Sequence, residues 1–163
     1  KKSPAFDEMI RSRFAPLHEQ ATDGQLAHWR EGTNASPLTL LALIIVCDQF
    51  PRNMFRDSPR AFATDAMALD AARQMRARGW DTRLSMVERQ FCYLPFEHAE
   101  DLDAQRTCLM LFGELGNADL LHWAQKHYDI IERFGRFPHR NAVLGRASTA
   151  AEAEFLKQPG SGF

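Results

Sequence analysis

Apolar residues recur along most of this chain at the spacing of a helix face, and this periodicity restricts the fold more than any other feature. The first such stripe falls at i, i+3, i+4, i+8 and i+11, on Phe6, Met9, Ile10, Phe14 and Leu17. No stretch longer than four residues alternates apolar and polar side chains, and no Asn-Gly or Asp-Gly step joins two strand-like runs. The sequence therefore predicts an all-α fold, with antiparallel helix pairs stacked as a right-handed superhelix or an irregular bundle.

Helix boundaries are indicated by caps and glycines. Ser36 before Pro37 is typical of a helix start, and the following segment Leu38–Phe50 is apolar nearly all round, so we expect it to be the central buried helix. Asp65 is expected to cap the next helix. Capping boxes are predicted at Ser85 with Glu88 and at Thr149 with Glu152. The glycines expected to end helices are Gly79, Gly116 and Gly135.

Composition is that of an ordinary globular protein. The 163 residues, 45% apolar and 25% charged, fit one domain over residues 1–163. The formal net charge of −1 argues against a general nucleic-acid binder. The tail from about residue 158 to 163 is expected to be mobile. The chain begins at Lys1 without an initiator Met, so its natural N-terminus is expected to be missing.

Cysteine usage and the lack of a targeting segment favour a cytoplasmic protein. Cys47, Cys92 and Cys108 share no Cys-x-x-Cys spacing and fall in apolar helical runs, so they are expected to be buried thiols in a reducing compartment. The apolar run Leu38–Cys47 is about ten residues, well short of a bilayer span, and no signal peptide is visible. No membrane partner is therefore expected.

Two similar segments interrupt the helical pattern, at residues 48–56 and 135–141. Each follows an apolar helical run and contains a Phe-Pro step, which is expected to stop the helix because proline lacks an N–H and clashes with the preceding turn. Arg and Asn follow each step. With the segment 94–101 they form three polar windows, at 48–60, 94–101 and 136–146, which meet if the helices alternate in direction.

The leading functional hypothesis is a binding module that recognises an anionic small molecule or the acidic or carboxylate end of a peptide. Arginine side chains are suited to this because the planar guanidinium binds carboxylate or phosphate with two hydrogen bonds. The predicted ligand-binding residues are Arg52, Asn53, Arg56, Glu97, His98, His139, Arg140 and Asn141. The alternative is structural: the same arginines would cap helices and pair with Asp48, Glu97 and Asp101.

The rival hypothesis is an enzyme, a hydrolase in which Glu97, His98 and Asp48 surround a water or a metal. A histidine beside carboxylates is a candidate general base. However, the chain has no His-Glu-x-x-His, Gly-x-Ser-x-Gly or phosphate-binding glycine loop, so no metal and no cofactor is expected and the binding role is preferred. A third reading, RNA binding through Arg and Phe pairs, conflicts with the net charge. His18 and His28 are expected at or near the surface.

Five motifs link the chain to a known family. In order they are DQFPRNMFR, RAFATD, YLPFEHAEDLDAQ, ERFGRFPHRNAVLGR and QPGSGF. At these spacings they closely resemble the bacterial family catalogued as domain of unknown function 924, over essentially the whole chain from Phe6 to Phe163. The resemblance implies a tetratricopeptide-like helical fold, and relatives carry an aromatic-rich Phe-Trp segment before the start of this chain. It implies no activity. The family's characteristic windows fall on Asp48, Gln49, Phe50, Pro51, Arg52, Asn53, Phe55 and Arg56, on Pro95, Glu97, His98 and Glu100, and on Phe137, Pro138, His139, Arg140 and Asn141.

Overall fold

A computed structural model describes residues 3–162, and within this part of the chain the protein has seven α-helices and no β-strand. The all-α prediction is confirmed. The helices are α1 (Pro4–Thr22), α2 (Pro37–Met54), α3 (Asp65–Ala77), α4 (Met86–His98), α5 (Leu102–Leu115), α6 (Ala118–Phe134) and α7 (Ala150–Phe155). Short 3₁₀ turns lie at Ala27–Trp29, Pro59–Ala61, Asp81–Arg83 and Pro138–Arg140.

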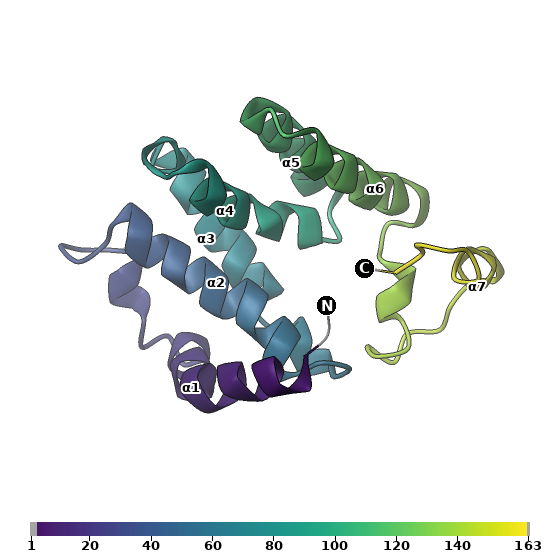
Figure 1. Cartoon of the computed structure of the whole chain (residues 1–163), viewed down its shortest axis with the longest axis horizontal. Coiled ribbons are helices and arrows are strands. Elements are labelled where there is room, and N and C mark those ends of the chain that lie inside the picture. Colours follow the sequence, from purple (N-terminus) through teal and green to yellow (C-terminus); the bar gives the residue numbers. More distant parts are fainter. Residues whose placement is uncertain (1–2, 163) are drawn as a thin grey trace.

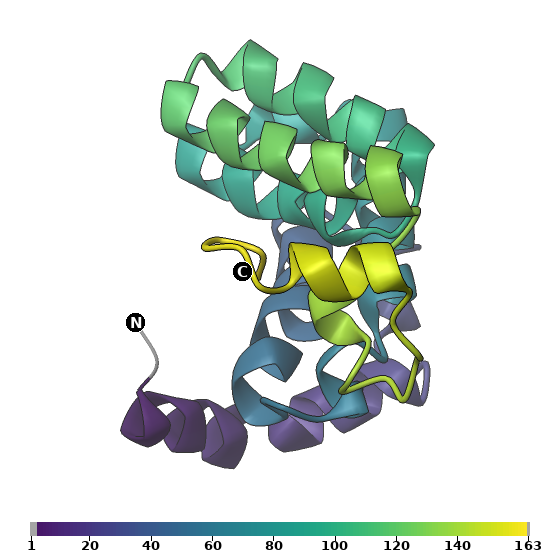
Figure 2. The same cartoon turned by 90° about the vertical axis from the view of Figure 1, so that its right-hand side faces the viewer.

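The helices follow one another through space in chain order (Figure 1), from α1 at the bottom of the view to α5 and α6 at the top. Each consecutive pair from α1 to α6 packs together, and α2 also packs on α4. The C-terminal segment, which we define as residues 136–162, turns back from the end of α6. Figure 2 shows it between α1 below and the α5–α6 pair above. This arrangement brings residues near 140 to the ends of α2 and α4.

Most predicted helix boundaries are confirmed. The side chains of Ser36, Ser85 and Thr149 cap α2, α4 and α7, each in a capping box. The prediction for Asp65 is wrong: Thr64 occupies the N-cap position and Asp65 is the first helical residue. Its carboxylate is directed to arginines instead of to the helix N-terminus.

Helix α2 lies at the centre of the core, as its apolar sequence predicts. Its residues Leu40, Ile44 and Cys47 have no exposed surface. Cys47 and Cys92 are buried free thiols, and burial raises the pKa of each to about 12, so neither is a ready nucleophile. No helix within residues 3–162 combines the length and the apolar character needed to cross a membrane.

The prediction that the Phe-Pro steps stop the helices is wrong at both places. Pro51 lies inside α2, which continues to Met54. Because proline has no N–H, the carbonyl of Cys47 one turn earlier lacks its helical donor. The hydroxyl of Thr64 donates to that carbonyl at 2.6 Å, so the carbonyl of Cys47 is not left unpaired where the helix passes through the proline. In the second segment Gly135, with φ 68°, ends α6 before the Phe-Pro step is reached.

His18 lies beside this bond and is buried, with 4% of its surface exposed, so its predicted surface location is wrong. Its Nε2 lies 3.3 Å from the oxygen of Thr64. Because the Thr64 hydroxyl proton points to Cys47, this oxygen accepts and Nε2 of His18 donates. Burial lowers the pKa of His18, which keeps the imidazole neutral.

Replacing Thr64 by Val should lower the free energy of unfolding by about 1–3 kcal/mol, because the Cys47 carbonyl loses its donor inside the core. Pro51→Ala restores the helical N–H, so Thr64→Val should be less destabilising in a Pro51→Ala background. The loss of the His18 contact is common to both backgrounds and cancels in this double-mutant cycle. Urea unfolding of the four proteins measures the coupling.

A matched control is Thr107→Val on α5, where an exposed hydroxyl donates to the carbonyl of Asp103. That change should stay within about 0.5 kcal/mol. Strictly additive effects of the Pro51 and Thr64 substitutions would show that the two residues do not compensate each other.

Candidate functional site

One cavity, of about 490 Å³, is bordered by side chains from all three polar windows. We call it the arginine cavity. Five of the predicted ligand-binding residues line it: Arg52, Arg56, His98, His139 and Arg140. The remaining lining residues are Asp57, Ala61, Phe62, His127, Val143 and Gly162. The convergence expected from the alternation of helices is therefore present, while Asn53, Glu97 and Asn141 lie outside the lining.

Asp48 on α2 is the most deeply buried charge beside the cavity, with no exposed surface. Its Oδ1 lies 2.7 Å from Nδ1 of His98 and 3.2 Å from Nη1 of Arg52. Burial opposes ionisation of this carboxyl, but His98 and Arg52 outweigh burial and hold its pKa at about 2. Asp48 is thus an anion at neutral pH.

His98, at the end of α4, is oriented by this carboxylate. Burial lowers the pKa of His98, and Arg52 lowers it further, although Asp48 acts in the opposite direction. A carboxylate can only accept, so Nδ1 of His98 carries the proton and donates to Asp48. Nε2 is then the basic atom of a side chain that lines the cavity.

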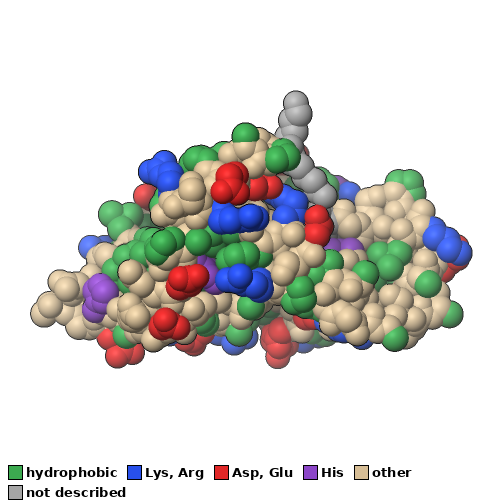
Figure 3. Space-filling model, turned by 90° about the horizontal axis from the view of Figure 1, so that it is seen from below, with side chains coloured by type: hydrophobic (Ala, Val, Ile, Leu, Met, Phe, Trp, Pro, Cys, Tyr) green, Lys and Arg blue, Asp and Glu red, His purple; other side chains and the backbone are tan. Residues whose placement is uncertain are grey.

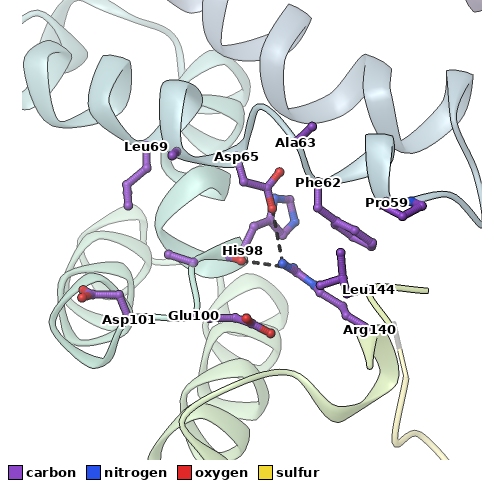
Figure 4. A pocket seen from close by; sticks show the side chains of 12 residues that line it. Pro59, Phe62, Ala63, Asp65, Leu69, His98, Glu100, Asp101, Arg140 and Leu144 are labelled. Atoms are coloured by element: carbon purple, nitrogen blue, oxygen red, sulfur yellow. Dashed lines mark hydrogen bonds and ion pairs between the residues drawn. The ribbon is translucent and has the colours of Figure 1, made fainter. Parts of the chain in front are cut away.

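Asp65 joins the two central arginines. Nη1 and Nη2 of Arg52 donate to its two oxygens at 2.8 and 3.0 Å, and Nη1 of Arg140 lies 3.3 Å from Oδ2. Nη2 of Arg140 donates to the carbonyl of His98 at 3.0 Å, as Figure 4 shows. Asp65 was assigned to helix capping by the sequence. The role of Asp65 as a partner of two arginines has one local signal in the sequence: Asp65 is an acidic residue in the first turn of a helix, and an arginine-rich segment precedes this helix.

Arg140 is buried between aromatic rings. Its guanidinium carbon lies 4.6 Å from the ring centroids of both Phe62 and Phe137, and 7% of the residue is exposed. Burial lowers the pKa of Arg140 to about 10, which leaves it charged at neutral pH. Among the described residues Nε of Arg140 has no hydrogen-bond partner.

Asn53 and Arg56 are held by α1. Nδ2 of Asn53 donates to Asp7 at 2.8 Å, and Nε and Nη2 of Arg56 each donate to it at 2.9 Å. Hydrogen bonds from Arg56 and Asn53 hold the pKa of Asp7 at about 2. Asn53 and Arg56 thus both connect α1 to the C-terminal end of α2 through Asp7. Of the two, Arg56 also lines the arginine cavity.

Asn141 and Glu100 secure the C-terminal segment. Oδ1 of Asn141 accepts from Nε of Arg146 at 3.0 Å. Arg146 also binds both oxygens of Glu100, at 2.6 and 2.9 Å, and Glu100 accepts the backbone N–H of Phe137 at 2.7 Å. Asp101 was predicted to pair with the arginines of the polar windows, and this is wrong: its side chain caps α5 and lies 3.8 Å from Nη2 of Arg73 on α3.

Glu97 contacts His127, a residue that the sequence analysis did not select. Its Oε1 lies 3.5 Å from Nδ1 of His127, which donates to the carbonyl of Trp123 at 2.8 Å. Burial raises the pKa of Glu97 to about 7, with the charge of Asp48 adding to the effect. Burial lowers the pKa of His127 to about 3 and that of His139 to about 4. The positive charge of the cavity at neutral pH therefore comes from its arginines.

The predicted set of Glu97, His98 and Asp48 is thus divided into two pairs, Asp48 with His98 and Glu97 with His127. Across residues 3–162, no three His, Cys, Asp or Glu side chains are grouped so that they could hold a metal ion.

Comparison with known proteins gives a family and a similar structure. The model of a family described as bacterial protein of unknown function (DUF924) matches residues 1–160. A solved structure of a protein of unknown function from Agrobacterium tumefaciens is 42% identical, with a TM-score of 0.90, over 98% of this chain and 88% of that one. None of the curated proteins gives a significant match.

Replacing Glu97 by Gln should stabilise the protein at alkaline but not at acidic pH. The folded-state pKa is about 7, above the ordinary 4.5, so the stability linked to the protonated carboxyl is present below pH 4.5 and is lost as pH rises to 7. Gln mimics the protonated form at every pH. We expect a gain of about 1–3 kcal/mol at pH 8 and little change at pH 4.5, measured by urea unfolding. The exposed Glu114 on α5, changed to Gln, is the control; equal effects of Glu97→Gln at both pH values would contradict the buried, protonated carboxyl.

Proposed function

We propose that this chain, which belongs to the DUF924 family of bacterial proteins of unknown function, is a helical binding module for an anionic ligand. The ligand would be a small molecule or the acidic or carboxylate end of a peptide, held in the arginine cavity. The observation that carries this proposal is that Arg52, Arg56 and Arg140, from two segments more than 80 residues apart in the sequence, border one cavity together with His98. The volume of about 490 Å³ is in the range of small-molecule sites.

The charge of the cavity wall supports an anion. Among the described residues, three arginines line it and a single carboxylate, that of Asp57, does so. The carboxylates that pair with the arginines lie elsewhere: Asp48 is fully buried, and Asp7 is on α1. A guanidinium has five N–H donors, so an arginine that is held by one carboxylate retains donors for a ligand.

The structural alternative explains part of this network. Arg52 and Arg140 join α2, α3 and the C-terminal segment through Asp65. A network that serves packing alone is expected to satisfy all its buried donors, because each unsatisfied one costs on the order of 1–3 kcal/mol. The unpartnered Nε of Arg140 departs from that expectation. Arg56, with about one-third of its side chain exposed, borders the cavity. We therefore infer that the arginines hold the helices and also present charge to a ligand.

A second function, general-base catalysis, is favoured by one specific observation. The Asp48–His98 pair, at 2.7 Å, fixes the imidazole with Nε2 unprotonated. In such a hydrolase Nε2 would take a proton from water as the water oxygen bonds to the carbonyl carbon or phosphorus of an ester in the cavity. The bond to the alcohol oxygen would then break, and the protonated Nε2 would return the proton to the leaving alcohol. Glu97 would have no direct part, because its carboxylate faces His127.

RNA binding is less well supported. The formal net charge is −1. On the face viewed from the α1 side (Figure 3), the Lys and Arg side chains lie beside Asp and Glu side chains and hydrophobic ones. RNA binding gains affinity when Lys and Arg side chains neutralise phosphates and displace their counterions. A surface on which positive and negative side chains are mixed offers few places where this can happen.

Binding is tested by thermal shift and titration with phosphate, acetate, succinate and a short acidic peptide. A ligand at about one hundred times its dissociation constant adds about 2.7 kcal/mol, a shift of about 5–10 °C for a chain of this size. Arg56→Gln should weaken binding of the best anion about tenfold, because one charge-assisted contact is lost at the cavity edge.

The matched control is Arg136→Gln. This arginine makes an equivalent two-bond contact with Glu152, at 2.6 and 2.8 Å, and lies outside the cavity lining. Equal loss of affinity in both variants, or no shift with any anion, would count against the proposal.

Catalysis is tested by hydrolysis of p-nitrophenyl acetate and p-nitrophenyl phosphate. If His98 is a general base, His98→Gln should lower kcat/KM by about 10²–10⁴ while circular dichroism stays helical. Asp48→Asn should lower it as well. Rates equal to those of buffer for the unaltered protein would leave binding as the sole function.

A further inference from the structure

A second cavity, of about 390 Å³, lies beside the arginine cavity and shares part of its wall (Figure 4). Phe62, His98 and Arg140 line both cavities. In Figure 4 the side chains of Phe62 and Arg140 lie next to each other, and dashed lines join Arg140 to Asp65 and to His98. Because Arg140 lines both cavities, a ligand that binds this arginine lies next to both of them.

The second cavity is mainly apolar. Its walls include Pro59, Phe62, Ala63, Ala66, Leu69 and Leu144. The carboxylates that reach it are already engaged: both oxygens of Asp65 accept from arginines, and Glu100 is bound by Arg146. Asp101 caps α5. Polar groups of a ligand would find few free partners here, whereas an apolar group would be removed from water. We call this space the apolar cavity.

We propose that the two cavities form one binding site, and that its ligand is an amphipathic anion. One carboxylate or phosphate group lies against the arginines, and an acyl chain or ring occupies the apolar cavity. This inference rests on the proposed function and narrows it from anions in general to those that carry a hydrophobic part.

The charges around the apolar cavity also restrict the ligand. Glu100, Asp101 and Asp65 present acceptor oxygens, not donors, to a second anionic group at the far end. A dicarboxylate or a polyphosphate is therefore a poorer ligand than a monoanion of the same length. An unsubstituted anion such as acetate fills only the polar part and gains nothing from the apolar walls.

The test is isothermal titration of the full chain with acetate, butanoate, hexanoate and octanoate. Affinity should rise about threefold to fourfold for each methylene group until the apolar cavity is filled. Hexylamine, with the same chain and the opposite charge, should not bind. Adipate, a six-carbon dicarboxylate, should bind more weakly than hexanoate.

Two variants test the location. Ala66 is exposed on α3 and borders the apolar cavity, so Ala66→Phe should fill it without disturbing the core. It should abolish the chain-length dependence and leave acetate binding unchanged. Ala77→Phe, at an exposed position at the other end of α3, is the control and should keep the dependence. Ala63→Phe, also exposed and lining the cavity, is a second filling variant should Ala66→Phe not fold.

The outcomes separate this inference from the proposed function. Arg56-dependent binding of acetate or phosphate with no gain from longer chains would overturn the amphipathic ligand and leave the anion site standing. A chain-length gain that persists in Ala66→Phe and Ala63→Phe would place the apolar part elsewhere and also overturn it. Binding of no anion of any length would overturn both proposals.

Discussion

The carboxylate of Asp48 is fully buried, and a buried charge is tolerated only where other groups compensate it. Arg52, one turn further along α2, and His98, from the end of α4, supply that compensation. Arg52 in turn holds Asp65 on α3, and Asp65 holds Arg140 of the C-terminal segment. Removal of Arg52 would leave the buried carboxylate of Asp48 without its cationic partner and would take one of two arginines from Asp65. The relative positions of α2, α3, α4 and the C-terminal segment therefore depend on this chain of contacts.

Pro51 determines where Asp65 can lie. The proline deprives the Cys47 carbonyl of its helical donor, so another group must donate to it inside the core. Thr64 does so, which fixes the residue immediately before Asp65 against α2. Asp65 then reaches Arg52, the residue directly after the proline. The hydrogen bond by which Thr64 compensates the proline in α2 thus also places Asp65 beside Arg52.

Much of the fold could be predicted from the sequence because the signals are local. The caps at Ser36 and Ser85 and the apolar face of α2 depend on residues within one or two turns. Partner choice is not local: Asp7 and Arg56 are 49 residues apart, and Arg140 and Asp65 are 75 apart. The sequence indicated that the arginines of the polar windows pair with carboxylates, but Asp101 was named as a partner, whereas Arg52, Arg56 and Arg146 pair with Asp65, Asp7 and Glu100. His127 gave no local signal, because its role depends on the packing of α6 against α4.

A site built into a stabilising network limits which substitutions can report on binding. Arg52 and Arg140 carry the contacts between segments, so their removal changes folding and ligand affinity together. Ala66, on the surface of α3, does not share this difficulty. Arg56 shares it in part, because it is one-third exposed but also binds Asp7 of α1, and the matched ion pair of Arg136 with Glu152 controls for that contact. An anion beside Arg140 would offset the burial that lowers its pKa, so ligand binding and the stability of the charge network should reinforce each other. The same buried charges that hold the helices together would then make the folded state more stable when the site is filled.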